Sequence, residues 1–279
     1  MLFLLDIYSK LYHISDIMSR HLVRDVLLGE PVFFISDTHL RYHKIGEKEK
    51  IKKRKLFKFL KEIRGASRLY LVGDIFDFWF EYKCCIPKFY MDILYNLRML
   101  RESGTSIYIT GGNHDFWLGS FIEEEMGFKI LPQISTHKLQ GRIITITHGD
   151  TLMPGDFRYK ILKKVIRGRL VIKIAGIIPP GLLYKFAGWF SSTSKDFTAG
   201  KTEYWADKLV DTAEDSFFKW GNDSFIMGHI HKPVVKYFGN RIFVILGDWE
   251  NHFSYLRLED GKFATGNYKG EENTLIENL

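Results

Sequence analysis

Gly111-Gly112-Asn113-His114-Asp115 is the stretch of sequence that decides the fold. It follows the apolar run Ile107-Tyr108-Ile109, which has the composition of a buried strand. The glycines make a turn, and the turn presents an amide, an imidazole and a carboxylate. Taken alone, this pattern is also typical of a capped loop. The rest of the chain decides between a loop and a chemical site.

Four further polar clusters follow short apolar runs in the same way. They are Asp37-Thr38-His39 after Val32 to Ile35, Gly73-Asp74-Ile75-Phe76-Asp77 after Leu69 to Val72, His148-Gly149-Asp150 after Ile143 to Ile146, and Gly228-His229-Ile230-His231 after Phe225 to Met227. Each motif alone is weak, because a single His is more often a satisfied core residue. Together, five strands that end in carboxylates, an amide oxygen and imidazoles predict a centre for two metal ions.

The residue types of these clusters favour particular metals and a particular reaction. Two divalent ions about 3.5–4 Å apart bind phosphoryl oxygens and activate water at neutral pH. One carboxylate between them is the simplest way to hold two cations so close. Mixed nitrogen and oxygen ligands suit manganese, iron, cobalt or zinc better than calcium, and we expect two ions, with Mn²⁺ first. The clusters contain no cysteine, which argues against a structural zinc site.

Length and composition describe an ordinary folded protein. The chain has 279 residues, of which 46% are hydrophobic and 26% charged, enough for one large domain or at most two. The net charge of +7 suggests an acidic partner: a phosphate ligand, a nucleic acid or an anionic membrane surface. The cysteines, Cys84 and Cys85, are adjacent, so we expect no disulfide framework and a reducing compartment.

Helical patterns alternate with the strands, which is typical of an α/β fold. Arg41 to Arg64 carries eleven Lys or Arg against three Glu, with apolar residues at helical spacing; we expect most of this charge on a solvated face. Helices are also expected at Met91 to Arg101 and Thr202 to Trp220. Three runs are expected as closing strands of a second sheet: Ile242 to Leu246, Phe253 to Leu258 and Phe263 to Tyr268.

The segment Phe157 to Lys195 differs from its surroundings. It has nine Lys or Arg and no Asp or Glu, interleaved with many aliphatic residues. Pro179-Pro180 divides it into two expected helices, and the charges and prolines argue against a transmembrane span. One interpretation is a helical hairpin that buries its apolar face on the core. We favour a lid, apolar inside and basic outside, that accepts a lipid while it faces anionic headgroups.

The ends of the chain have their own patterns. Leu4, Ile7, Leu11, Ile14 and Met18 have helical spacing, and the segment lacks the features of a signal peptide. This helix either packs on the domain or anchors it to a membrane surface. We expect an amphipathic extension over residues 1–30, one domain over residues 31–270 with the lid at about 155–200, and a polar, frayed tail over residues 271–279.

The five motifs resemble those of the calcineurin-like metallophosphoesterase superfamily from about Val32 to Leu258. The resemblance implies a four-layer α/β/β/α sandwich with a helical lid insertion and with metals at the strand ends. It implies that Asp37, His39 and His231 bind one ion, that Asn113, His148 and His229 bind the other, and that Asp74 bridges the two. It implies that His114, paired with Asp115, donates a hydrogen bond or proton to the phosphate. Asp77 and Asp150 would orient the ligands.

A narrower resemblance is to the UDP-2,3-diacylglucosamine hydrolases of lipid A biosynthesis. It is carried by Phe34-Ile35-Ser36-Asp37-x-His39-Leu40, Gly73-Asp74-Ile75-Phe76-Asp77-Phe78-Trp79, His148-Gly149-Asp150-Thr151-Leu152, Gly228-His229-x-His231-Lys232-Pro233 and Leu246-Gly247-Asp248-Trp249. It implies attack of water on the α-phosphate, giving UMP and 2,3-diacylglucosamine 1-phosphate (lipid X). It also implies a lid for the acyl chains and a place on the cytoplasmic face of the bacterial inner membrane.

This resemblance suggests which residues contact the substrate. Asp156 and Tyr159 match substrate-contacting positions, and Ser194 and Lys195 are candidates to touch the sugar or phosphate. The best-known branch has Arg where this chain has His114. An Arg stabilises charge without transferring a proton, so His114 indicates either altered electrostatics on the same substrate or a different substrate.

The leading hypothesis is therefore a peripheral membrane pyrophosphatase that acts on a nucleotide-linked lipid. A soluble phosphoesterase acting on a cyclic nucleotide or a phosphoprotein gives no reason for the apolar lid. The net charge favours a nuclease, but the basic residues interleave with aliphatic residues and not with the stacking aromatics of a strand-binding surface. A non-catalytic scaffold is disfavoured because every metal-ligand position is filled.

Overall fold

The computed structural model describes residues 29–43, 45–153, 165–188, 202–218, 221–268 and 273–276. The strands are β1 Val32–Ile35, β2 Arg68–Val72, β3 Ser106–Thr110, β4 Lys129–Leu131, β5 Ile134–Leu139, β6 Arg142–Thr147, β7 Ser224–Met227, β8 Val234–Phe238, β9 Arg241–Ile245, β10 Ser254–Glu259, β11 Lys262–Tyr268 and β12 Asn273–Ile276. The helices are α2 Glu47–Glu62, α3 Met91–Glu102, α5 Arg169–Ala175 and α7 Thr202–Phe217, with the short turns η1 Lys88–Tyr90 and η2 Phe121–Glu125. The expected α/β class is confirmed.

The strands form two sheets. One has the order β12-β11-β10-β1-β2-β3-β4 and the other the order β5-β6-β7-β9-β8. In the first sheet β1, β2 and β3 are parallel neighbours, and in the second β6 is parallel to β7. The expectation that β10 and β11 belong to the second sheet is wrong, because β10 pairs antiparallel with β1. Of the three closing strands, β9 alone lies in the second sheet.

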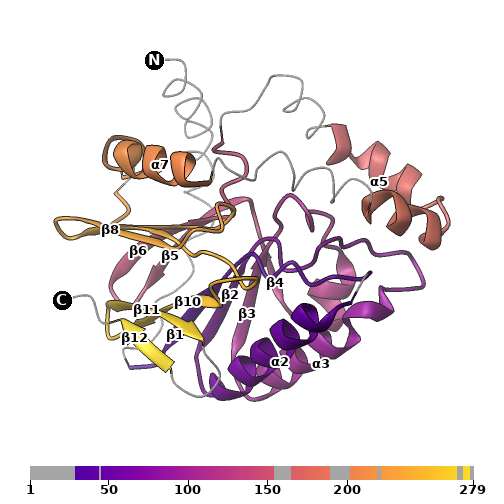
Figure 1. The fold of residues 1–279 in the computed structure, drawn as a ribbon, viewed down its shortest axis with the longest axis horizontal. Helices are drawn as coiled ribbons and strands as arrows, with labels where there is room; N and C mark the ends of the chain where they lie inside the picture. Colours follow the sequence, from indigo (N-terminus) through magenta and orange to yellow (C-terminus); the bar gives the residue numbers. More distant parts are fainter. Residues whose placement is uncertain are drawn as a thin grey trace.

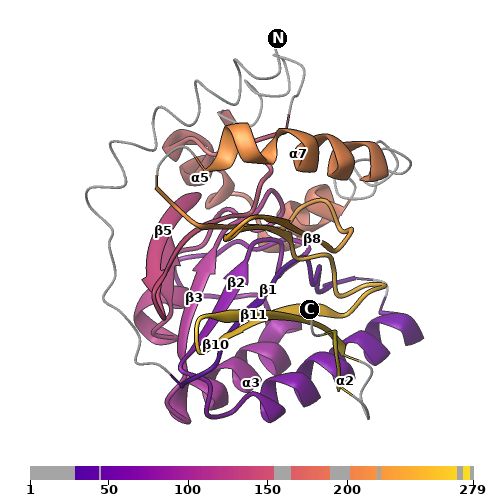
Figure 2. The ribbon, with the colours of Figure 1, turned by 90° about the vertical axis from the view of Figure 1, so that its left-hand side faces the viewer.

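The two sheets share a core, and helices cover their outer faces. Val32, Phe34 and Tyr70 from the first sheet pack with Ile146 and Ile226 from the second. On the far side of the first sheet, side chains of α2 and α3 pack against the strands; on the far side of the second, α7 does so. Figures 1 and 2 show this succession of helices and sheets. Each large apolar side chain fully buried in these cores contributes about 1.5–3 kcal/mol.

Most charged residues of helix α2 are exposed, as the sequence predicts, but three are buried. These three are Glu49, Lys52 and Lys53. Lys52 Nζ donates to His39 O at 2.8 Å and forms an ion pair with Glu49 at 2.8 Å. Because a lysine is long, it can carry its charge past the apolar stripe of the helix to acceptors beneath. The basic helix therefore supports the loop after β1.

The expected polar tail, residues 271–279, contains a strand. Asn273–Ile276 pairs with β11 as the edge strand β12, so the expectation of a frayed tail is wrong for these residues. Residues 1–28 of the expected amphipathic extension lie outside the described residues. A helix begins at Pro180 and extends to residue 188, so the break from α5 falls at Pro179-Pro180, as the sequence predicts.

Candidate metal centre

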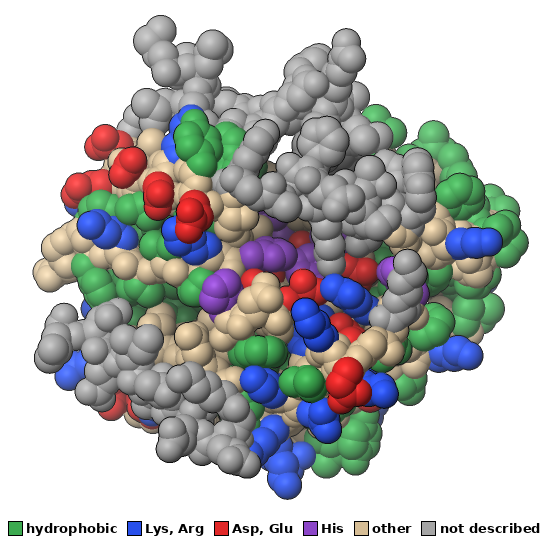
Figure 3. All heavy atoms as spheres, viewed as in Figure 1, with side chains coloured by type: hydrophobic (Ala, Val, Ile, Leu, Met, Phe, Trp, Pro, Cys, Tyr) green, Lys and Arg blue, Asp and Glu red, His purple; other side chains and the backbone are tan. Residues whose placement is uncertain are grey.

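The five polar clusters come together because of the strand directions. Parallel neighbours place their carboxyl ends at one edge of a sheet, and the loops after β1, β2 and β3 therefore lie together. The loops after β6 and β7 do the same in the second sheet. Histidine and acidic side chains gather at the centre of the face shown in Figure 3. The two sheets thus contribute jointly to one site.

Asp37, His39 and His231 form the first group of candidate ligands. Their ligand atoms lie within 4.8 Å of one another. His231 Nε2 is 3.3 Å from Asp37 Oδ1 and 3.1 Å from His39 Nε2. Asp37 Oδ1 is buried and accepts no hydrogen bond within the described part of the chain. A buried carboxylate oxygen without a donor is costly, and a cation bound by these three residues would satisfy it.

Asp74, His148 and His229 form the second group, again within 4.8 Å. His148 Nδ1 donates to Val72 O at 3.0 Å, which leaves Nε2 to face the site. That atom is 3.3 Å from Asp74 Oδ2 and 3.3 Å from Asn113 Oδ1. Asp74 Oδ2 also lies 3.7 Å from His39 Nε2 of the first group. Asp74 therefore lies between the two groups, as a bridging carboxylate must.

The backbone at these residues is strained. Five of the candidate ligands have positive φ angles: Asp37 53°, His39 40°, Asp74 54°, His229 72° and His231 60°. Non-glycine residues adopt this left-handed region rarely, at a cost of about 1–3 kcal/mol each. Such strain persists only where the surrounding structure imposes it, and it concentrates at functional sites. The concentration of strain here marks the cluster as functional.

Two motif glycines make room for the ligands. A Cβ on Gly112 would lie 2.1 Å from Asp74 Oδ1, and one on Gly73 would lie 2.4 Å from His148 Nδ1. Gly73 also has a φ of 78°, which glycine adopts without a steric penalty. Any side chain at these positions would displace Asp74 or His148. The glycines are therefore required for the close approach of the loops.

Burial and mutual charge shift the pKa values of the second group. Burial opposes ionisation of Asp74, but the charges of His148, His114 and His39 hold the pKa of its carboxyl well below the usual value. Burial lowers the pKa of His148, but Asp74 outweighs it and raises this pKa to about 10. Burial, with the charge of His148, lowers the pKa of His229 to about 4. The carboxylate of Asp74 thus favours the protonated form of His148 in the absence of a cation, and a metal ion bound there competes with that proton.

Asp115 has a different place from the one expected. Its carboxylate accepts hydrogen bonds from four backbone N–H groups, those of Gly112, Asp74, Ile75 and Phe76, at 2.7–3.2 Å. Burial, then the charge of Asp74, raise its pKa to about 6 against these hydrogen bonds. The expected pairing with the His114 ring is not formed in the described part of the chain, because the carboxylate binds these backbone groups while the His114 ring contacts Asp77. Asp115 ties the loop after β3 to the loop after β2.

His114 contacts Asp77 instead. Its Nδ1 lies 3.2 Å from Asp77 O and 3.9 Å from Asp77 Oδ1. His39 Nδ1 is 4.0 Å from the same carboxylate, and the rings of His39 and His114 meet edge to face at 4.8 Å. His39, Asp77 and His114 thus form a third cluster of ligand type. Since His39 Nε2 faces Asp37 and Asp74, Asp77 is placed to orient the two imidazoles from the opposite side.

The residues present fit a pair of divalent cations, and this fit predicts a change in stability. We expect Mn²⁺ to raise the unfolding temperature of chelator-treated protein, because a ligand at a hundred times its dissociation constant stabilises by about 2.7 kcal/mol. For a chain of this size that is roughly 5–10 °C. Differential scanning calorimetry with Mn²⁺ and with excess EDTA measures the shift. Asp37→Ala should lose part of it, and an unchanged unfolding temperature in the wild type would contradict the fit.

Four residues expected to contact the substrate lie outside the described part of the chain, and two residues that support the site were not predicted from the sequence. Asp156, Tyr159, Ser194 and Lys195 lie outside the described residues. Lys52, which holds the carbonyl of His39, and Arg167, which binds Asp150 at 2.8 Å, were missed by sequence reasoning. Each is one cation within a strongly basic segment, so no local signal separates it from its neighbours.

The comparisons with known proteins agree with this geometry. Residues 30–233 match the model of the calcineurin-like phosphoesterase family. The chain is 32% identical over 175 residues to the UDP-2,3-diacylglucosamine hydrolase of Yersinia pseudotuberculosis serotype O:1b, covering 63% of this chain and 72% of that one. It is 30% identical over 237 residues to the enzyme of the same name from Photorhabdus laumondii, covering 81% and 94%. The chain is thus a hydrolase that belongs to the calcineurin-like phosphoesterase family, with a site for divalent metal ions built from its His and Asp clusters.

Proposed function

We propose that this chain hydrolyses the pyrophosphate of UDP-2,3-diacylglucosamine by attack of water on the α-phosphate, giving UMP and 2,3-diacylglucosamine 1-phosphate. The observation that carries the proposal is the position of Asp74, 3.7 Å from His39 and 3.3 Å from His148. A single carboxylate between two ligand groups is what a two-ion phosphoesterase needs. The substrate is inferred from the relatives that this chain resembles, which are named UDP-2,3-diacylglucosamine hydrolases.

The proposed roles follow from the contacts of the side chains. Asp37, His39 and His231 would hold one ion, Asn113, His148 and His229 the other, and Asp74 would bridge them; Mn²⁺ is the proposed metal, with Fe, Co or Zn as alternatives. When bound, the ions supply activation of water and neutralise phosphoryl charge. His114 Nδ1 contacts Asp77 O, so in the imidazolium form Nε2–H is left to donate to a phosphoryl oxygen. Asp77 then holds the orientation of that donor.

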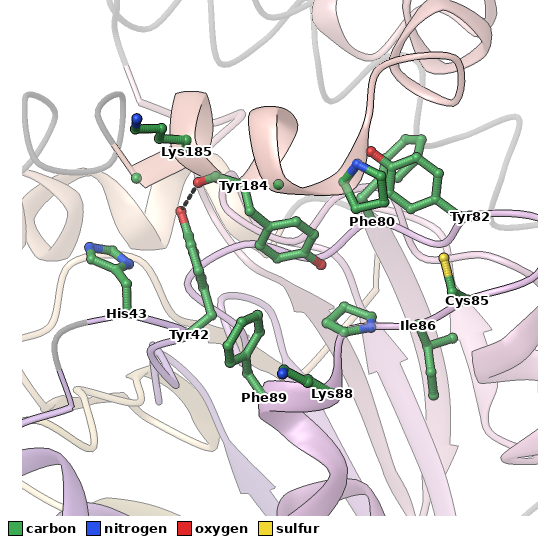
Figure 4. A pocket seen from close by; sticks show the side chains of 14 residues that line it. Tyr42, His43, Phe80, Tyr82, Cys85, Ile86, Lys88, Phe89, Tyr184 and Lys185 are labelled. Atoms are coloured by element: carbon green, nitrogen blue, oxygen red, sulfur yellow. Dashed lines mark hydrogen bonds between the residues drawn. The ribbon is translucent and has the colours of Figure 1, made fainter.

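A cavity of about 730 Å³ supports a lipid substrate. It lies between the helix at residues 180–188 and the segment from Phe80 to Phe89; its walls are mainly apolar, and His43, Lys88 and Lys185 also line it (Figure 4). Tyr42 OH donates to Tyr184 O at 2.8 Å across it. None of its lining residues is a candidate metal ligand, but Tyr42 follows His39 by three positions. We propose that an acyl chain occupies this cavity while the pyrophosphate reaches the metal centre.

The outer surface of the lid supports contact with a membrane. The expectation of an apolar inside and a basic outside is wrong for the described part, since Leu170, Ile177 and Phe186 are 71%, 83% and 63% exposed. Lys173 and Lys185 are exposed among them, and residues 165–188 contain no Asp or Glu. Helix α5 lies at the edge of the molecule, where apolar side chains reach the surface (Figures 1 and 3). Apolar and basic residues together favour the surface of an anionic membrane.

This surface leads to a proposed location on the cytoplasmic face of the bacterial inner membrane, as a peripheral protein. Across the described residues, every helix is too short or too polar to span a bilayer. Attachment would therefore come from surface contact. Sedimentation with vesicles that contain anionic lipid tests it, and binding that is equal with neutral vesicles would contradict the electrostatic part of the proposal.

Incubation of the purified protein with Mn²⁺ and UDP-2,3-diacylglucosamine tests the function directly. Release of UMP, followed by chromatography, is the expected result, and oxygen from labelled water should enter the UMP. Deacylated UDP-glucosamine and a chromogenic phosphodiester serve as soluble comparisons. If the soluble esters are cleaved at comparable rates, the chain is a phosphoesterase of broader specificity and the lipid assignment is wrong.

Substitution of Gly181 tests the cavity. Gly181 lines it, and a Cβ there would meet nothing within 4 Å, so a side chain can be added at this position without displacing the backbone. Excluding three or four methylenes of an acyl chain costs roughly 3 kcal/mol at about 0.8 kcal/mol each. We therefore expect Gly181→Leu and Gly181→Trp to raise KM for the lipid progressively, to about a hundredfold. Gly181→Ala is the control, and cleavage of a small chromogenic ester should stay unchanged in all three variants.

A further inference from the structure

Arg167 joins the base of the lid to two loops of the metal centre. Its Nη2 donates one hydrogen bond to Gly112 O at 3.0 Å and another to Asp150 Oδ2 at 2.8 Å. Gly112 directly precedes Asn113, and Asp150 follows His148 by two positions. The Arg167 side chain is 19% exposed and that of Asp150 is 3% exposed. One nitrogen atom therefore contacts both loops from which Asn113 and His148 project.

Two more contacts fix the lid base to the segment after Asp115. The guanidinium of Arg167 lies 5.1 Å from the ring centroid of Phe116, within the range of a cation–π interaction. Trp117 Nε1 donates to Ile166 O at 3.3 Å. Because neighbouring residues on both sides take part, the lid base and the loop after β3 must move together.

Asn113 lies between two backbone anchors. On one side the carbonyl of Gly112 is held by Arg167, and on the other the N–H of His114 donates to Asp74 Oδ1 at 2.8 Å. The first anchor comes from the lid and the second from the centre itself. The loop that carries Asp37 and His39 is held by contacts that do not involve Arg167: Lys52 donates to His39 O, and His229 N donates to Asp37 Oδ2 at 2.9 Å.

We infer that Arg167 is a positioning residue through which the lid controls the affinity of one ion, the ion held by Asn113, His148 and His229. The inference rests on the ligand assignment of the proposed function. If the lid base moves away, the carbonyl of Gly112 loses its donor, and Asp150 is left as a buried charge beside His148. The loop then keeps the hydrogen bonds of Gly112 N–H to Asp115 and of His114 N–H to Asp74. The carbonyl that precedes Asn113 is no longer fixed, however, so the Asn113 side chain is held less firmly toward the site. The ion on Asp37, His39 and His231 keeps its supports.

The test is a manganese titration of the metal-free protein. Electron paramagnetic resonance counts free Mn²⁺ and separates isolated from exchange-coupled bound ions. For Arg167→Ala we expect one dissociation constant to rise about ten- to a hundredfold, the usual effect of removing a group that supports a ligand, while the other stays unchanged. The coupled signal should give way to an isolated one. Arg167→Lys, which keeps the charge on a shorter side chain, should lie between the two.

The controls separate positioning from a structural role. Lys173→Ala removes the same charge from an exposed site on the lid and should bind both ions like the wild type. Asp150→Asn removes the ion pair without touching the lid and should weaken the same ion as Arg167→Ala. Two tight ions in Arg167→Ala, or equal weakening of both, would overturn the inference even if the unfolding temperature falls. A wild-type protein that binds a single ion would instead overturn the two-ion assignment beneath it.

Discussion

Asp74→Asn should abolish hydrolysis. The substitution keeps the shape of the side chain but removes the charge that lies between His39 and His148. Two cations a few ångströms apart repel each other strongly without a bridging anion, and their combined effect on the reaction is several kcal/mol. At 1.36 kcal/mol per tenfold change in rate, the loss is about a thousandfold or more. Release of UMP measures the rate, and atomic emission spectroscopy measures the bound metal, which should fall below two ions per chain.

Asp211→Asn on α7 is the matched control for this experiment. Asp211 is exposed and lies on the helix that covers the second sheet, so the same chemical change should leave rate and metal content unaltered. Circular dichroism of both variants separates loss of the fold from loss of the bridge. Full activity in folded Asp74→Asn would contradict the bridging role. The cluster of His39, Asp77 and His114 would then be the alternative metal site.

His114→Ala should slow the reaction about a hundredfold while both ions remain. A positioned acid or hydrogen-bond donor commonly contributes 10²–10⁴, and the imidazole contacts Asp77 rather than the ligand atoms of Asp74. The backbone N–H of His114, which donates to Asp74 Oδ1, survives the change to alanine. Steady-state kinetics with the lipid substrate should show the loss in kcat, because the imidazole acts on charge that develops during the reaction.

Two further variants at this position distinguish the roles of His114. His114→Arg supplies a permanent charge without a transferable proton, and His114→Gln supplies an uncharged donor. Recovery with Arg but not with Gln means that charge stabilisation is the main contribution. Metal loss in His114→Ala would contradict the assigned role and make His114 a ligand. Cleavage of an activated ester, whose leaving group needs no proton, should be least affected if His114 acts as an acid.

The ligand clusters could be predicted from the sequence because each lies directly after a strand. Parallel strands present their carboxyl ends at one edge, so recognition of the strands sufficed to place Asp37, Asp74 and Asn113 together. The prediction that β10 and β11 belong to the second sheet is wrong because nothing in their sequence identifies the strand beside them. A short alternating strand such as Ser254–Glu259 carries no local record of its neighbour, and here that neighbour, β1, is more than two hundred positions away.

The supporting contacts were beyond the sequence for a different reason. Asp115 accepts hydrogen bonds from four backbone N–H groups. Nearly every residue has a backbone N–H, so the sequence does not show which ones will donate. Arg167 and Lys52 act through carbonyl oxygens, which every residue has. Their value depends on distances between loops far apart in the chain. Residue patterns therefore found the chemical groups of the centre but not the scaffold that orients them.

Each candidate ion draws ligands from both sheets: Asp37 and His39 follow β1 while His231 follows β7, and Asp74 follows β2 while His148 follows β6. Neither sheet alone therefore supplies a complete set of candidate ligands. We expect bound cations to join the two sheets, so that removing metal should loosen the contact between the sheets before it disrupts either one.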